Sequence, residues 1–151
     1  MKTSVIAVVA SLLLSISNIF TGTTSNLYKN TIVDENNREV TTVYSGEDGK
    51  YLTPVKQYTT TRDDAGNITE RKICVWNGVS QSWVNSKKYI FKCNTNGDVV
   101  VLGYIKWNAN FKQWEKDITY TVYQQNIEEE KLVINNIKGE EAQKLHAELN
   151  K

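Results

Sequence analysis

The sequence contains a single histidine, no excess of charge of either sign and no apolar run long enough to cross a membrane. His146 has no Cys, Asp or second His at ligand spacing, which argues against a metal site. A Ser-His-Asp triad would have to use this same His, and no G-x-S-x-G motif accompanies it. The 18 basic and 17 acidic residues are scattered along the chain, so no basic footprint for nucleic acid is present. We therefore expect no metal, no cofactor and no nucleic-acid partner.

The N-terminus has the pattern of a secretory signal. Met1-Lys2 precedes an apolar run of 10 residues, Val5 to Leu14, which is followed by a more polar stretch. The run is shorter than the roughly 20 residues of a membrane span, and no cysteine stands near its end for lipoprotein acylation. We expect residues 1–22 to be a signal peptide, cleaved between 17 and 26. The mature chain would be secreted, to the periplasm or outside the cell, without a transmembrane span.

A 31-residue repeat organises the rest of the chain. Tyr58, Gly66, Trp76, Asn77 and Trp83 recur at this offset as Tyr89, Gly97, Trp107, Asn108 and Trp114. We expect repeats at about 58–88 and 89–119 within one domain, 27–151, with Tyr120 opening a truncated copy. A degenerate copy at about 28–57 is indicated by Asp34 to Asn37 and by the aromatic residues Tyr44 and Tyr51.

The regularly spaced turn residues of the repeat predict an all-β fold. Asp63 to Asn67 and Asn94 to Asp98 carry the Asp, Asn and Gly residues of tight hairpin turns. Runs rich in β-branched and aromatic residues lie between the turns, at Ile68–Trp76, Trp83–Cys93, Val99–Trp107 and Trp114–Tyr123. Short links at both ends of each run predict an antiparallel meander of repeated hairpins. Lys131 to Ile137 could add a strand, and residues 140–150 form a short amphipathic helix in this prediction.

Parity predicts which side chains share a face. If Trp76 faces Trp83, Trp107 faces Trp114, and Cys93 faces Val99, strict alternation separates an apolar face from a mixed one. The apolar face includes Tyr89, Trp107, Trp114 and Tyr120, and the mixed face includes Lys88, Ile90, Leu102 and Tyr104. In this register Cys74 faces Asn85, and Cys93 lies eight residues further along, about 26 Å away at 3.3 Å per residue. We therefore expect Cys74 and Cys93 not to form a disulfide.

Three groups of residues are candidates for function. Trp76, Trp83, Trp107 and Trp114 could stack sugar rings, or could simply stabilise the sheet as cross-strand pairs. Glu70, Glu115 and Asp117 are available as carboxylates for hydrolysis, but no spacing singles out a pair. The Asp- and Asn-rich turns lack the remaining ligands and the flanking helices of a calcium loop, so we interpret them as turns. We assign no catalytic residue.

The combination of signal peptide, short length and repeat pattern resembles the secreted proteins grouped as domain of unknown function 3836, found mostly in gut Bacteroidota. The likeness rests on Tyr58, Gly66-Asn67, Trp76-Asn77, Trp83, Tyr89, Gly97-Asp98, Trp107-Asn108, Trp114 and Tyr120. It spans roughly residues 51–125. The resemblance implies export and a β-repeat fold, and it implies no activity, cofactor or site residue.

These observations favour an exported, non-catalytic interaction or binding module at or outside the cell envelope, with a protein or a glycan as partner. An alternative is a carbohydrate-binding module that stacks glycans on the four Trp residues. A third hypothesis is a small carboxylate-dependent hydrolase, which would need two acids in one cleft. Because an open meander has unpaired edge strands, we also expect either that the C-terminal segment covers an edge or that the protein pairs edge to edge with a partner, and self-association is one hypothesis.

Overall fold

The structure is a computed structural model that describes residues 26–47, 49–126 and 131–149. The predicted signal segment, residues 1–22, lies outside the described residues. The described part of the chain contains no helix with the length and apolar character that crossing a bilayer requires. Its elements are β1 (Asn26–Val33), β2 (Glu39–Gly46), β3 (Thr53–Arg62), β4 (Ile68–Asn77), β5 (Ser82–Cys93), β6 (Val99–Asn108), β7 (Gln113–Trp114), β8 (Thr119–Asn126), β9 (Lys131–Ile137) and the helix α2 (Gly139–Leu149).

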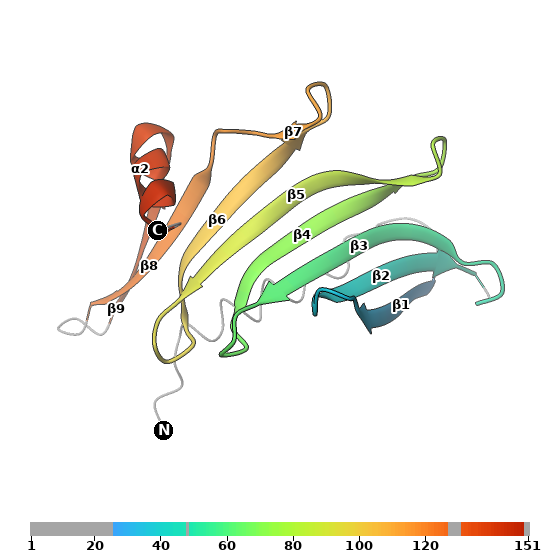
Figure 1. The fold of residues 1–151 in the computed structure, drawn as a ribbon, viewed down its shortest axis with the longest axis horizontal. Helices are drawn as coiled ribbons and strands as arrows, with labels where there is room; N and C mark the ends of the chain where they lie inside the picture. The colour runs from blue at the N-terminus through green and yellow to red at the C-terminus, as the bar shows by residue number, and fades with distance from the viewer. Residues whose placement is uncertain (1–25, 48, 127–130, 150–151) are drawn as a thin grey trace. The chain divides into compact units, whose positions relative to one another are not determined.

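The strands form one antiparallel sheet in meander order, which confirms the predicted fold class (Figure 1). The order of hydrogen-bonded neighbours is β1-β2-β3-β4-β5-β6-β8-β9, and the short β7 pairs with β6. The predicted helix is also present, at Gly139–Leu149. Contacts divide the described chain into two compact units. We call residues 26–47, 49–88 and 106–114 the N-terminal unit, and residues 89–105, 115–126 and 131–149 the C-terminal unit.

Three hairpin turns share one geometry. Each begins with an Asx residue whose side-chain oxygen accepts the backbone N–H four residues later, at 2.8, 2.8 and 3.0 Å for Asp34, Asp63 and Asn94. The fourth residue of each turn has a positive φ, which is 56° at Asn37, 85° at Gly66 and 85° at Gly97. A type I turn followed by a left-handed residue is the usual three-residue hairpin loop. The two predicted turns are therefore confirmed, and the turn of the degenerate copy has the same form.

The predicted strand Trp114–Tyr123 is wrong as a single strand. It is divided into β7 and β8 by residues 115–118. Continuing the pairing of Trp107 with Trp114 would place Val101 opposite Tyr120, whereas Val101 pairs with Val122. Two additional residues are thus accommodated between β7 and β8. Because this number is even, the side-chain alternation is preserved across the interruption.

Strict alternation is wrong for Lys88 and Ile90. The Lys88 Nζ lies 5.2 Å from the centre of the Trp114 ring, so these residues share a face. A Cβ at Gly103, whose partner is Tyr120, would lie 3.4 Å from the Cβ of Ile90. A β-bulge adds one residue to a strand and moves the following side chains to the other face. Such shifts occur at Val43/Tyr44 and at Thr61/Arg62, and the faces of Lys88 and Ile90 require a comparable departure from strict alternation in β5.

The buried apolar residues are distributed unequally between the units. In the N-terminal unit they are Val43, Ile73 and Cys74. In the C-terminal unit they are Phe91, Val99, Val101, Leu102, Ile105, Ile118, Tyr120, Tyr123 and Ala142. Leu102 is among them, although strict alternation places it on the mixed face. The N-terminal unit therefore depends more on its backbone ladder and on cross-strand pairs than on a core.

The two cysteines are not joined by a disulfide, and Cys74 has a neighbour that the register predicted. Its Sγ donates a hydrogen bond to Asn85 Oδ1 at 3.3 Å, which confirms that the two residues face each other. Burial raises the pKa of the Cys74 thiol. The thiol is thus kept neutral and unreactive, as expected of a small buried hydrophobe.

Tyr120 is the centre of the C-terminal unit. Its side chain is fully buried, and its ring covers Gly103 on the neighbouring strand β6. Its hydroxyl shares a hydrogen bond of 2.5 Å with His146 Nδ1 on α2. Ala142 on the same helix is also fully buried. An 11-residue helix is marginal alone in water, so this contact with β8 stabilises α2.

The shared turn geometry predicts that Asn is tolerated better than Ala in place of Gly66. Replacing Gly66 by Ala should lower the free energy of unfolding by about 1 kcal/mol, because a left-handed backbone is costly for Ala. Asn at this position should cost less, since Asn37 adopts the same conformation in the equivalent turn. Urea denaturation of Gly66→Ala and Gly66→Asn checks the difference. Equal stability of the two variants would contradict it.

Gly103 is predicted to tolerate no side chain. A Cβ there would lie 2.6 Å from Cε1 of Tyr120, so Gly103→Ala must displace a buried ring and should cost about 1–3 kcal/mol. Gly78→Ala is the matched control, because a Cβ at Gly78 has no neighbour within 4 Å. Its effect should stay within about 0.5 kcal/mol. Similar denaturation midpoints for the two variants would refute the proposed close packing.

Candidate functional site

Two tryptophan pairs stand at equivalent places in the repeat, in the N-terminal unit. The ring centroids of Trp76 and Trp83 are 5.1 Å apart at an interplanar angle of 69°, and those of Trp107 and Trp114 are 5.0 Å apart at 73°. Both pairs confirm the predicted cross-strand partners. All four side chains are half-buried, so they belong neither to the core nor to the fully exposed surface. Edge-to-face pairs of this kind contribute about 0.5–1.5 kcal/mol beyond their buried area.

The tryptophan pairs close two loops that have related structures. Asn77 Oδ1 accepts hydrogen bonds from the backbone N–H groups of Val79 and Ser80, at 2.9 and 3.1 Å. Asn108 Oδ1, 31 residues later, accepts one from Phe111 at 3.2 Å. Gln81 and Lys112 occupy equivalent positions and have φ values of 47° and 51°. Each Trp-Asn dipeptide therefore combines a ring pair with a polar side chain that holds the loop.

Apolar side chains project from the tips of these loops. Val79 is 97% exposed and Phe111 is 73% exposed. Tyr51, in the connection between β2 and β3, is 90% exposed. In an antiparallel meander every second connection lies at the same end of the sheet, so these three residues share one end of the N-terminal unit (Figure 1). We call Tyr51, Val79, Phe111 and the two tryptophan pairs the loop end.

Lys88 is a neighbour of the loop end that sequence reasoning missed. Its Nζ forms an ion pair with Glu70 Oε2 at 3.3 Å and lies over the Trp114 ring. Strict alternation places Lys88 on the other face from Trp114, and no spacing in the sequence signals this departure from it. The ammonium group covers part of one face of Trp114. Trp76, Trp83 and Trp107 are therefore the better candidates to stack on a ligand.

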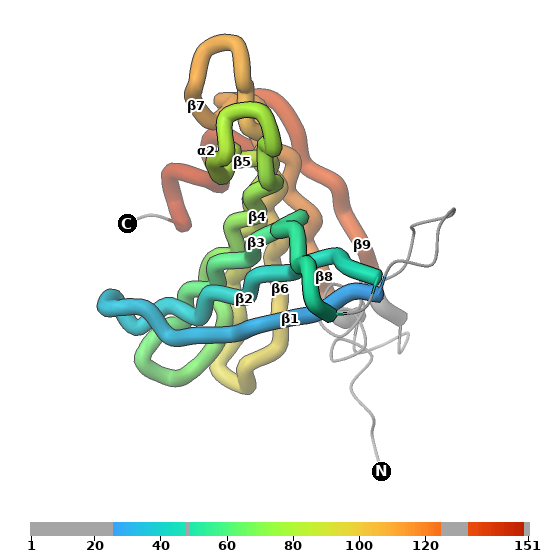
Figure 2. The backbone as a smooth tube through the Cα atoms, turned by 90° about the vertical axis from the view of Figure 1, so that its right-hand side faces the viewer, coloured from blue at the N-terminus to red at the C-terminus, as the bar shows by residue number. Residues whose placement is uncertain are grey.

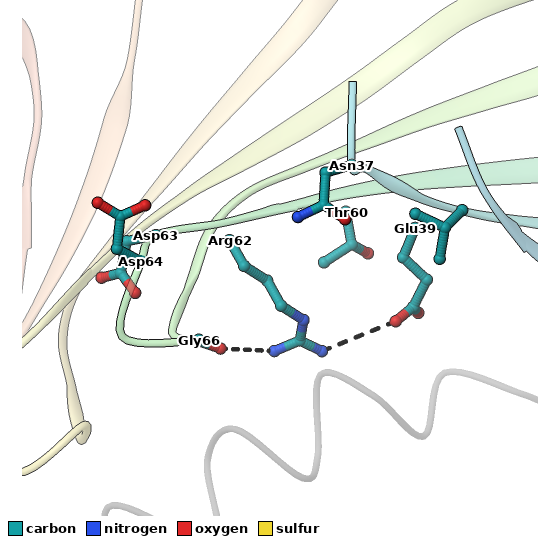
Figure 3. Close-up of a pocket in the computed structure, with 8 residues that line it drawn as sticks. Asn37, Glu39, Thr60, Arg62, Asp63, Asp64 and Gly66 are labelled. Atoms are coloured by element: carbon teal, nitrogen blue, oxygen red, sulfur yellow. Dashed lines mark hydrogen bonds and ion pairs between the residues drawn. The ribbon is translucent and has the colours of Figure 1, made fainter. Parts of the chain in front are cut away.

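A polar depression lies at the opposite end of the same unit, beside the Asx turns. It has a volume of about 460 Å³ and is lined by Val33, Asn37, Glu39, Thr60, Arg62, Asp63, Asp64 and Gly66 (Figure 3). Arg62 crosses it, with Nη1 donating to Gly66 O at 2.9 Å and Nη2 lying 3.9 Å from Glu39 Oε2. Hydrogen bonds from the Asn67 backbone and side chain hold the pKa of Asp63 below its usual value. Its carboxylate is therefore suited to holding the turn and not to donating a proton.

The predicted carboxylate candidates lie in two elements of the fold. Glu70 is ion-paired with Lys88, and Glu115 and Asp117 belong to the irregular segment between β7 and β8. Among the residues that the structure describes, no three His, Cys, Asp or Glu side chains are grouped so that they could hold a metal ion. The Asx turns use their side-chain oxygens as acceptors for backbone N–H groups, as described above.

His146 has a structural contact that the sequence did not indicate. It is half-buried on α2 and bonded to Tyr120, 26 residues earlier in the chain. Only the folded C-terminal unit brings the two together. The contact connects the helix to β8, so His146 acts in docking the helix.

Replacing Tyr120 by Phe should lower the free energy of unfolding by about 1 kcal/mol, because the hydrogen bond to His146 is lost while the ring remains. Burial raises the pKa of Tyr120, so the fold favours the neutral phenol. That contribution is complete below about pH 10 and is lost as the pH rises through the raised pKa of the folded state. The variant should therefore lose less stability than the wild type in alkaline urea titrations. Tyr104→Phe is the control variant. If Tyr120→Phe lost as much stability at alkaline pH as the wild type does, this role of Tyr120 would be contradicted.

Three solved structures are similar to this chain, with TM-scores of 0.49, 0.49 and 0.43. The first is a DUF3836 family protein from Bacteroides vulgatus, which is 19% identical, with 74% of this chain and 98% of that chain covered. The second is a Bacteroides fragilis protein of unknown function, which is 13% identical, with coverages of 77% and 94%. The third is a DUF3836 family protein from Parabacteroides distasonis, which is 12% identical, with coverages of 81% and 98%.

The family match confirms the resemblance that the repeat motifs indicated. No curated protein matches the sequence. The family model, described as a family of unknown function (DUF3836), matches residues 1–88, which include the predicted signal segment and the first repeat. The chain therefore belongs to the DUF3836 family, whose function is unknown.

Proposed function

We propose that this chain is an exported, non-catalytic binding module whose partner docks on the loop end. The observation that carries the proposal is the exposure of Tyr51, Val79 and Phe111 at one end of the N-terminal unit. Large apolar side chains that project from loop tips gain free energy when a partner covers them. Loops held by a rigid sheet are also the usual place for binding residues. The apolar run at Val5–Leu14 supports export.

A glycan is the partner class that the chemistry of these loops favours. Half-buried tryptophan rings lie at the base of both loops, and an aromatic face can stack on the C–H face of a sugar. Exposed amides stand next to them, on Gln81, Asn110 and Gln113. An amide offers both a donor and an acceptor, which matches neighbouring sugar hydroxyls. Carbohydrate binding is therefore the second, more specific candidate.

Retention on washed cell envelopes tests the binding module. The double variant Val79→Asp/Phe111→Asp should bind about tenfold or more weakly than the wild type, because it removes two exposed anchors and adds charge. Ile134→Asp is the matched control, since Ile134 is 54% exposed on β9, away from these loops in the sequence. Equal retention of the wild type and the double variant, or no retention of either, would overturn the proposal.

Tryptophan fluorescence titrations with a panel of soluble glycans test the second candidate. A shift with one glycan class that is lost in Val79→Asp/Phe111→Asp supports carbohydrate binding. Absence of any shift across the panel rejects glycans, while the envelope measurement still decides whether the loop end binds another partner.

A further inference from the structure

The edge strand β1 is regular, and on one of its sides no strand of the described residues pairs with it. All eight residues of β1 pair with β2 in one continuous register, from Asn26 opposite Gly46 to Val33 opposite Glu39. Among the described strands, β2 is the one neighbour of β1, which lies at the edge of the sheet (Figures 1 and 2). The other side of β1 therefore presents backbone N–H and C=O groups in the pattern that a further strand would need.

β1 lacks most of the features that keep edge strands from pairing. Proline, bulges and short length are the common protections, and β1 has none of these in its eight residues. Its single charged side chain is Lys29. Three apolar side chains are exposed instead: Leu27 at 43%, Ile32 at 56% and Val33 at 66%. The strand thus combines an available backbone with apolar surface on both of its faces.

We propose that β1 pairs with β1 of a second copy of this chain, antiparallel, around a two-fold axis at Asn30. A two-fold axis perpendicular to a continuous sheet keeps each residue on the same face in both copies. Directly opposite residues in an antiparallel pair also lie on the same face. Only residues of equal parity can therefore be opposite each other, and the axis must pass beside a residue that pairs with its own counterpart.

The side chains select Asn30 as that residue. With the axis there, Leu27 lies opposite Val33 of the second copy, and Tyr28 lies opposite Ile32. Apolar and aromatic pairs of this kind stabilise adjacent strands, and Lys29 then lies opposite Thr31, without a like charge. Moving the axis to Lys29 would place two ammonium groups opposite each other. Moving it to Thr31 would place Lys29 opposite Val33 and Asn30 opposite Ile32.

The pairing does not depend on the proposed function. Tyr51, Val79 and Phe111 belong to connections between strands, and none of them lies in β1. A dimer joined through β1 would carry two copies of the loop end, which would raise the avidity for a partner with repeated binding sites. Self-association and partner binding can therefore be measured separately.

Cysteine crosslinking tests the register in the full-length chain, purified as the cell processes it. Asn30→Cys should form a disulfide-linked dimer under mild oxidation, because only this position faces itself across the axis. Lys29→Cys and Thr31→Cys are matched controls that report the two neighbouring registers. The wild type supplies the background from Cys74 and Cys93. Faster crosslinking at position 29 or 31 than at 30 would overturn the proposed register.

Sedimentation equilibrium tests the association itself. The wild type should show a concentration-dependent dimer, and Ile32→Lys/Val33→Lys should weaken it about tenfold or more by replacing apolar pairs with charges. Val79→Lys, at an exposed residue outside β1, should leave the dimer unchanged. A wild type that remains monomeric at the highest soluble concentration would overturn the proposal. So would a dimer that Ile32→Lys/Val33→Lys does not affect.

Discussion

The side-chain oxygen at the start of each three-residue turn is the contact on which the rest of this fold depends. Asp34, Asp63 and Asn94 each hold a backbone N–H four residues ahead, and a left-handed residue completes the turn. This geometry returns the chain antiparallel to itself with a defined register. Repetition of the turn produces a meander in which each strand pairs with neighbours close in sequence. A sheet built in this way needs no long-range contact to establish its strand order.

The second property of the fold is the unequal burial of its two units. The C-terminal unit surrounds Tyr120, with α2 held against β8 and Gly103 leaving room for the ring. The N-terminal unit buries few apolar side chains and presents others at its loop tips and along β1. Its stability comes from the ladder, the turns and the tryptophan pairs. Because the N-terminal unit buries few apolar side chains, apolar surface is exposed at its loop tips and along β1. We assign partner binding to the first of these surfaces and self-association to the second.

The tryptophan pairs have two properties that are compatible with each other. Edge-to-face packing stabilises the ends of the hairpins, and partial exposure leaves ring surface for a ligand. Asn77 and Asn108 hold the adjoining loops, so the exposed side chains of Val79 and Phe111 are carried on ordered backbone. A surface that is ordered before binding loses less conformational entropy when a partner docks. Lys88 distinguishes the second pair from the first by covering part of Trp114.

Local sequence determined the turns, most of the strands, the terminal helix and the partners of the tryptophans, because each depends on residues close together in the chain. Because of the 31-residue repeat, the sequence contains these features twice. Gly66 and Gly97 mark equivalent turns, and Trp76 and Trp107 mark equivalent tryptophan pairs. The tertiary structure decided which face Lys88 and Ile90 occupy, where the last predicted strand is interrupted, and that His146 meets Tyr120. A bulge changes the face of every residue that follows it, and its position depends on packing between strands and not on a local signal. The contact between α2 and β8 likewise depends on a ring that fits over Gly103, and it exists only once the sheet has formed.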